Sequence, residues 1–243
     1  MHLKLLLPVL ALGAVTPAYA EWTGTGEAGL VISSGNTETE TANVKVAMAH
    51  EKDKWKNAFG LNALYASDDI GTTAQRWEAL TQSDYNFSPK TFWFGAARYE
   101  DDRFSGFDYQ ATLSTGLGRK FIDTERTQFI GTAGVGYKVF ETRDAFDDAG
   151  VLIEEGARED DIVFRGTLDF EHQLTESTSV IDKFIVEAGA DNTFYQNDLA
   201  LQVKMTEILA LAVGYSVRHN SDPPAGFKKT DTLTTVNLVY EIK

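Results

Sequence analysis

Apolar and polar residues alternate along most of the chain. In the segment 22–34, Ala28, Leu30 and Ile32 fall on one face, and the polar and small residues fall on the other. The return run, residues 38–50, alternates in the same way after a Ser-Gly-Asn-Thr sequence that favours a tight turn. A two-residue period is typical of a β-strand with one apolar side. The pattern therefore predicts a hairpin of two long strands.

The same pattern recurs along the chain and predicts twelve strands. Several of these runs have a dozen or so residues, whereas strands in soluble sheets average roughly 5–6 residues and a tilted membrane-spanning strand needs roughly 9–11. The expected strands span residues 22–34, 38–50, 55–66, 76–87, 91–100, 108–121, 128–140, 162–171, 178–188, 199–205, 208–219 and 230–242.

The connections between these strands differ in length according to their order. The even-numbered connections, at 51–54, 88–90, 122–127, 172–177 and 206–207, are all short, and among the odd-numbered ones only 34–37 is short. Transmembrane barrels combine short periplasmic turns with longer external loops and have an even number of strands. The predicted fold class is therefore all-β: an antiparallel up-and-down transmembrane β-barrel of about 12 strands, with both termini on the periplasmic side.

Two further patterns favour a barrel over a flat sandwich. Glycines such as Gly116 and Gly134 fall on the polar face, where they would relieve crowding on the concave side of a closed sheet. Large aromatic residues lie toward strand ends, as in the girdles of membrane barrels. They are Trp22, Trp55, Trp77, Tyr85, Phe87, Trp93, Phe121 and Tyr240.

The first 20 residues predict a signal peptide rather than part of the fold. Lys4 precedes an apolar run, and Ala18-Tyr19-Ala20 has the small-x-small pattern of a signal-peptidase site. The apolar run is too short for a spanning helix of about 20 residues. We expect cleavage after Ala20, export of the chain, and a barrel domain over residues 21–243.

Composition excludes several functional classes. The chain has no cysteine, which excludes disulfides, thiol catalysis and a lipidated cysteine. Its formal net charge of −14 argues against nucleic acid as a partner. The expected partners are outer-membrane lipid, lipopolysaccharide and the barrel insertion machinery. The last strand ends on Ile242 where such barrels usually have an aromatic residue, and the sequence leaves the oligomeric state open.

Charges of both signs fall on the predicted inner face. Inside a barrel they must pair with one another or meet water. A dry lumen would lock them in salt bridges as a structural plug, and a wet lumen would be a narrow channel that selects solutes by charge. Twelve strands fit either case. The lumen-lining candidates are Lys45, Glu78, Asp84, Arg98, Glu100, Lys120, Lys138, Arg165, Asp169 and Glu171, together with Asp108, Lys183, Glu187 and Lys204.

Residues 141–161 interrupt the alternation and predict an external acidic loop. An EF-hand frame starting at Asp144 fails because Phe146 and Ala149 occupy positions that need a ligand and a glycine. We predict no cofactor and no dedicated metal site, although acids here could bridge through divalent cations to lipopolysaccharide; a solvated loop is the simpler interpretation. The acids are Asp144, Asp147, Asp148, Glu154 and Glu155.

The histidines give no catalytic spacing. His219 near Ser216 or Ser221 is the one pair that an outer-membrane lipid-modifying enzyme could use. A histidine at a strand end is the simpler interpretation, so we predict no catalytic residues.

The segment from Trp22 through Ser33-Ser34-Gly35-Asn36-Thr37-Glu38-Thr39, with a signal peptide, an all-β body and no cysteine, resembles the salt-induced outer membrane proteins of the YdiY type. The resemblance implies a Gram-negative outer-membrane β-barrel of uncharacterised role and supplies no catalytic residues. Three functions are compatible with it: a narrow channel for small or charged solutes, a non-conducting structural protein used under salt stress, and, least favoured, a lipid-modifying enzyme.

Overall fold

The computed structural model describes residues 22–34, 40–67, 72–103, 105–146, 150–224 and 226–242. The predicted signal peptide, the turn at residues 35–37, Asp147 and Asp148 lie outside the described residues.

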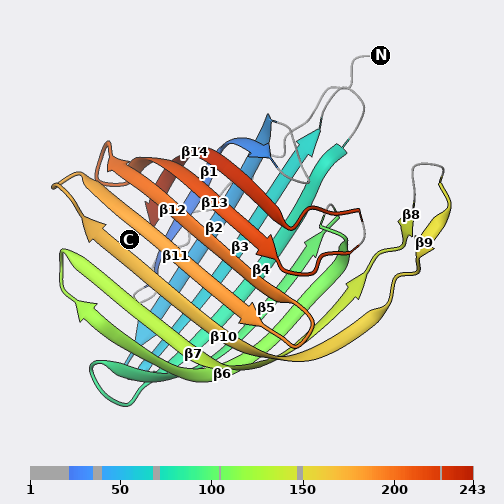
Figure 1. The fold of residues 1–243 in the computed structure, drawn as a ribbon. Helices are drawn as coiled ribbons and strands as arrows, with labels where there is room; N and C mark the ends of the chain where they lie inside the picture. Colours follow the sequence, from blue (N-terminus) through green and yellow to red (C-terminus); the bar gives the residue numbers. More distant parts are fainter. Residues whose placement is uncertain are drawn as a thin grey trace.

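Twelve strands form one closed antiparallel barrel (Figure 1). Barrel strands that are consecutive in the sequence are hydrogen-bonded neighbours, so the topology is up-and-down. The predicted fold class is confirmed. A separate pair of very short strands, β8 (Ala145–Phe146) and β9 (Leu152–Glu154), projects beyond one rim. The barrel strands are β1 (Trp22–Ser34), β2 (Glu40–Lys52), β3 (Trp55–Ser67), β4 (Thr72–Asn86), β5 (Thr91–Asp102), β6 (Phe107–Asp123), β7 (Thr127–Thr142), β10 (Arg158–Gln173), β11 (Thr178–Ala188), β12 (Thr193–Lys204), β13 (Leu209–Asn220) and β14 (Thr230–Ile242).

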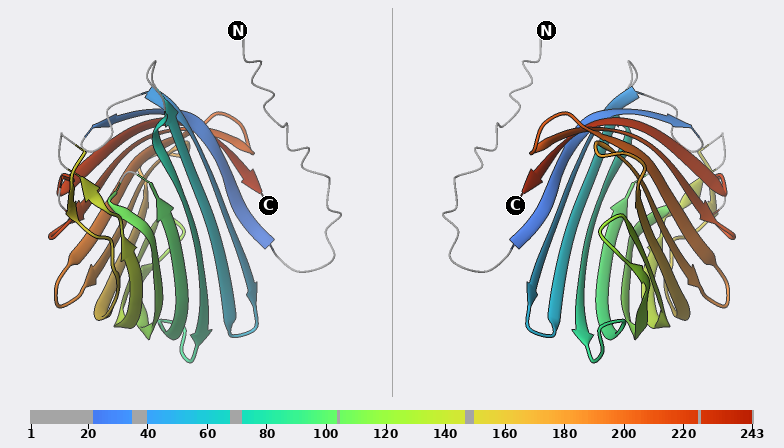
Figure 2. Two further views of the ribbon diagram at one scale, coloured as in Figure 1. Left: turned by 90° about the vertical axis from the view of Figure 1, so that its right-hand side faces the viewer. Right: turned by 90° about the vertical axis from the view of Figure 1, so that its left-hand side faces the viewer.

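The first and last strands close the barrel. Gly24 of β1 faces Met48 of β2 on one side and Ile242 of β14 on the other. Figure 2 shows β1, in blue, beside β14, in red. Closure removes the free sheet edges that would otherwise pair with other chains. The two ends of the described chain lie at the same rim, which is also the rim of the short turns.

The strands run further than the sequence pattern predicts. We expected a connection from 189 to 198 that contains Phe194 and Tyr195, but both residues belong to β12. Likewise, β7 continues to Thr142 and β10 begins at Arg158, so the predicted 141–161 loop was too long. Beyond the apolar belt water can reach both faces of a strand, so the alternation fades while the backbone pairing continues. Because the strands are longer than predicted, the odd-numbered connections are shorter than expected, and they differ less in length from the even-numbered ones.

The distribution of apolar residues is inverted relative to a soluble protein. Large apolar side chains cover the outer wall, and Leu113 in the middle of β6 is 68% exposed. The buried apolar residues are few and lie on the inner face, such as Phe92, Phe94 and Val163. An apolar belt of this extent fits contact with lipid rather than water. Among the described residues, no helix is long and apolar enough to cross a membrane.

Aromatic pairs lie near both rims. At the short-turn rim, the rings of Trp55 and Tyr85 have centroids 5.1 Å apart. At the opposite rim, Trp77, Tyr99 and Tyr109 form a row across β4, β5 and β6, with centroids 5.0 and 6.0 Å apart. Two aromatic bands flanking an apolar wall are typical of membrane barrels.

Candidate functional site

The inner face of β5 carries the central charged residues. Arg98 and Glu100 are two positions apart and therefore point to the same side of the sheet, while Tyr99 between them lies on the outer wall. Both are buried, and Glu100 is 0% exposed. Alternation along this one strand thus places an ion pair inside the barrel.

Arg98 binds one carboxylate on the neighbouring strand β4 and one on its own strand β5. Its Nε donates to Glu78 of β4, and its Nη2 lies 2.6 Å from Oε2 of Glu100. Asn62 of β3 donates to the other oxygen of Glu78 at 3.0 Å. Buried charges are tolerated only where such partners are present, and each of these carboxylates has more than one.

Glu100 also binds a group on the opposite wall. Its Oε1 accepts a hydrogen bond of 2.6 Å from Nη2 of Arg218 on β13. In the ring of twelve strands, β5 and β13 lie six places apart, which is as far apart as two strands can be. The Glu100–Arg218 pair therefore crosses the lumen.

A third carboxylate, Glu187 of β11, extends the network. Its Oε2 lies 3.6 Å from Nζ of Lys138 on β7 and 3.8 Å from Nη1 of Arg98. Thr112 donates to the same oxygen at 3.4 Å. We refer to Glu78, Arg98, Glu100, Lys138, Glu187 and Arg218 as the lumen network.

One aromatic ring lies among the cations of the lumen network. Phe194 of β12 is 1% exposed. Its ring centroid lies 5.0 Å from Cζ of Arg98, 5.6 Å from Nζ of Lys138 and 5.2 Å from Cζ of Arg218. Cations at this distance over a ring face are attracted by its quadrupole, more strongly where water is excluded. Phe194 thus contacts three cations, each of which also pairs with a carboxylate of the lumen network.

A second layer on the inner face of β5 is apolar. Phe94 is 0% exposed, and Phe92 lies over Gly118, where a β-carbon would come within 2.1 Å of the Phe92 ring. The ring occupies the space that this glycine leaves free. Together, the aromatic layer and the lumen network fill the interior with side chains at these levels, which is the arrangement expected of a dry lumen.

The structure places the other predicted lumen residues in different settings. Lys45, Asp84 and Asp169 are half-buried, Arg165 is buried, and Lys120 pairs with Asp123 at 3.4 Å near the short-turn rim. Glu171, Lys183 and Lys204 are exposed, and so is Asp108, which pairs with Arg143 at 2.9 Å. Of the fourteen predicted positions, five belong to the lumen network: Glu78, Arg98, Glu100, Lys138 and Glu187.

Arg218 and Phe194 are the important residues that the sequence analysis missed. Arg218 alternates with Tyr215 and Val217 on the outer side, so it falls on the same face as the small Ser216. That signal was sufficient to assign it to the lumen. Phe194 had no such signal because its segment was interpreted as a connection.

The external acidic residues do not form a cation site in the described part of the chain. Asp144 is exposed, and its Oδ1 accepts a hydrogen bond of 2.7 Å from the backbone amide of Gly156. Glu155 is exposed, and Glu154 belongs to β9. Within the described ranges, no three His, Cys, Asp or Glu side chains gather closely enough to hold a metal ion.

The candidate catalytic pair does not assemble. His219 stacks on Tyr195 with a centroid distance of 4.8 Å, and its Nδ1 lies 2.8 Å from Oγ1 of Thr230. Ser216 is three positions away on the same strand and therefore faces the other side of the sheet. Ser221 instead donates to Asn192 and accepts from the backbone amide of Thr193.

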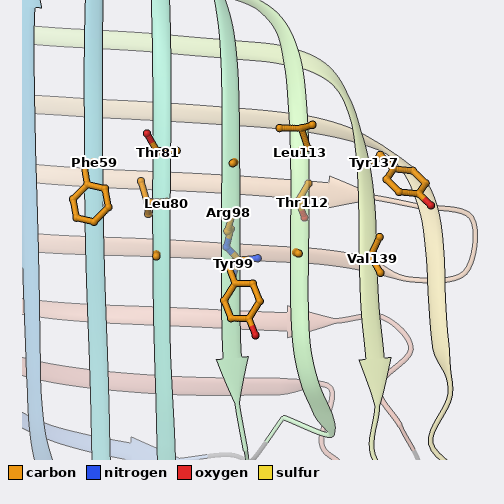
Figure 3. Close-up of a pocket in the computed structure, with 12 residues that line it drawn as sticks. Phe59, Leu80, Thr81, Arg98, Tyr99, Thr112, Leu113, Tyr137 and Val139 are labelled. Carbon is orange, nitrogen blue, oxygen red and sulfur yellow. The ribbon is translucent and has the colours of Figure 1, made fainter.

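A shallow apolar hollow of about 450 Å³ lies in the wall formed by β3 to β7 (Figure 3). Small residues such as Ala79, Ala97 and Ala111 line it between larger side chains that include Tyr99 and Tyr137. Its lining is almost entirely apolar and most of it belongs to the outer wall. The hollow is therefore mainly part of the apolar belt, although Arg98 of the lumen network is also one of its lining residues.

Solved structures with a similar fold are membrane-type barrels. The NanC porin superimposes with a TM-score of 0.55 at 11% identity, over 90% of this chain and 100% of the porin. The translocator domain of the autotransporter NalP from Neisseria meningitidis superimposes with a TM-score of 0.53 at 12% identity, over 90% of this chain and 88% of that domain. At these identities the likeness concerns the fold alone.

Sequence comparison identifies the family. The chain is 26% identical over 221 residues to the uncharacterized protein YdiY of Escherichia coli (strain K12), which covers 90% of this chain and 82% of the relative. The model of a protein family of unknown function, DUF481, matches residues 26–242. The resemblance to the YdiY type is thereby confirmed, and the chain belongs to the DUF481 family of proteins of unknown function.

Proposed function

We propose that the protein is an integral outer-membrane barrel that acts as a narrow channel for small, charged solutes, with the lumen network as its constriction. The apolar outer wall and its two aromatic bands support the membrane assignment. The proposal includes three further steps. Residues 1–20 direct export, the barrel insertion machinery places the protein in the membrane, and the folded barrel contacts lipopolysaccharide.

The crossing pair Glu100–Arg218 is the observation that carries the channel proposal. It joins opposite walls near the rim that carries the longer loops, since Glu100 and Arg218 each lie two residues from the end of their strand. Among the described residues, the groups that fill the lumen at this level are side chains on strands, and a path would open by rotation of Arg98, Arg218 and the Phe194 ring between them. Rings of fixed charges at a constriction select ions by sign.

Single-channel recording in a planar bilayer tests the proposal. The wild type should give discrete openings of small conductance. Arg98→Ala and Lys138→Ala each remove one cation of the lumen network, so their openings should shift in selectivity toward cations. Arg103→Ala, at an exposed residue just beyond β5, is the control and should keep the wild-type selectivity. A folded protein without discrete openings would refute the channel.

A non-conducting structural barrel is the second candidate. The complete burial of Glu100 and Phe94 favours it, because a water-filled path would expose both residues. This function predicts a silent bilayer and a deletion strain with altered salt tolerance or envelope permeability. A deletion strain that matches its parent in both properties would remove this candidate.

A further inference from the structure

Arg165 lies on the inner face beside two glycines. Cross-strand pairing aligns Phe94, Gly116, Gly134 and Arg165 in one row across β5, β6, β7 and β10, with Glu187 of β11 next in the row. Because the two glycines carry no side chains, the Arg165 side chain can extend over them toward β5. Its Cζ lies 5.7 Å from the centroid of the Phe94 ring.

Arg165 differs from the other buried cations in having no counter-charge at contact distance. Within the described residues it makes no ion pair of 4.0 Å or less, although it is only 9% exposed, and its Nη1 has no hydrogen-bond partner. Glu187 is its neighbour in the row, but Oε2 of Glu187 faces Lys138 and Arg98. Asp169, four positions along β10, also makes no ion pair with it.

The charge balance of the buried residues leads to the same point. Among the described residues, the buried cations are Arg98, Lys138, Arg165 and Arg218, and the buried carboxylates are Glu78, Glu100 and Glu187. Each carboxylate lies within 4.0 Å of at least one cation other than Arg165. Arg165 is therefore the buried cation that no buried carboxylate approaches within 4.0 Å, while Asp84 and Asp169, also on the inner face, are half-buried.

We infer that Arg165 is the binding site for a small monovalent anion inside the lumen. A buried guanidinium without a counter-charge is costly, and an anion taken up from solution would remove that cost and accept the hydrogen bond that Nη1 does not make within the protein. Nη1 is buried among protein atoms, so we take the anion to be of the size of chloride. This inference deepens the proposed function, because it makes small anions the preferred solute, but the binding itself does not depend on conduction.

Thermal unfolding of the refolded barrel in detergent tests the site. Chloride would be titrated against gluconate, a bulky anion, at constant ionic strength, and the midpoint of the heat-induced mobility change would be followed on gels. The wild type should show a saturable rise of the midpoint with chloride. Arg165→Gln should abolish the rise, and Arg165→Lys should keep part of it.

Lys183→Gln is the matched control. It removes the same charge from the inner face of the adjacent strand β11, but at an exposed position. It should keep the full chloride response. A wild type without a chloride response, or an equal response in Arg165→Gln, would overturn the inference.

A second readout separates the site from the channel. If the bilayer shows openings, reversal potentials in a potassium chloride gradient should give chloride selectivity in the wild type and a several-fold lower chloride-to-potassium ratio in Arg165→Gln. Equal ratios in the two proteins would overturn the role of Arg165 in solute choice. A silent bilayer with a chloride-dependent midpoint would refute the channel and support the anion site.

Discussion

Glu100 holds together two walls of the barrel. One oxygen accepts from Arg98 on its own strand, and the other accepts from Arg218 on the opposite wall. The carboxylate is wholly buried, so its loss would leave Arg218 without its ion-pair partner, whereas Arg98 would keep Glu78. Breaking a buried ion pair at one end usually costs about 3–5 kcal/mol, because the remaining charge is not compensated.

A double-mutant cycle on this pair should reveal the coupling. Glu100→Ala should lower the free energy of unfolding in lipid vesicles by about 3–5 kcal/mol. The double mutant Glu100→Ala, Arg218→Ala should lose clearly less free energy of unfolding than the sum of the two single mutants. The reason is that Arg218 has no carboxylate partner once Glu100 is removed. Urea titration followed by tryptophan fluorescence measures all three.

Asp123→Ala is the control for this cycle. Asp123 pairs with Lys120 near the short-turn rim and its side chain is 46% exposed, so its loss should cost at most about 1 kcal/mol. Additive losses for Glu100 and Arg218 would mean that the two side chains do not meet across the lumen.

Gly116 marks a close approach of two strands. A β-carbon there would lie 2.2 Å from the carbonyl oxygen of Ala133 and 2.5 Å from Cα of Gly134. Gly116→Val should therefore destabilise the barrel by about 1–3 kcal/mol or prevent its closure, measured as the folded fraction on unheated gels. Gly26→Val should fold normally, since a β-carbon at Gly26 meets no atom within 4 Å. Equal folded fractions would contradict the close approach.

At the scale of strands, the sequence pattern predicted the strand segments that lie within the apolar belt and missed the strand ends that extend beyond it. On β7 the alternation assigned Lys138 to the inner face because large apolar residues hold the outer positions, whereas on β5 the apolar face was ambiguous and the charges of Arg98 and Glu100 decided it. At residues 158–161 and 193–195, strand pairing continues where no apolar pattern is required. The side-chain partners across the lumen could not be predicted, since they depend on which strands face each other after closure.

The outer wall of β6 should respond to charge as a lipid-facing surface. Leu113→Arg, in the middle of the strand, should destabilise the barrel in phosphatidylcholine vesicles by about 2–4 kcal/mol. The same change at Val203, near the short-turn rim, should cost about 0–1 kcal/mol. Urea unfolding in vesicles measures both. Exposed positions in water usually tolerate such a change within about 0.5 kcal/mol, so equal and small costs would contradict membrane embedding.

At the scale of the whole molecule, the barrel combines an apolar exterior with an interior that charged side chains close near the rim of the longer loops. The crossing pair Glu100–Arg218 joins opposite parts of the wall that are 118 positions apart in the chain. We propose that the lumen network both stabilises the closed barrel and controls any path through it. This dual role is the central claim for the molecule.

Cross-linking of the two walls during current recording tests that claim most directly. The chain has no native cysteine, so Glu100→Cys with Arg218→Cys provides the only two thiols in the protein. A short bifunctional thiol reagent should link residues 100 and 218, identified by mass spectrometry of the digested protein, and should abolish the step currents recorded before its addition. A failure of the two thiols to link, or currents unchanged after linkage, would contradict a solute path that passes through the lumen network.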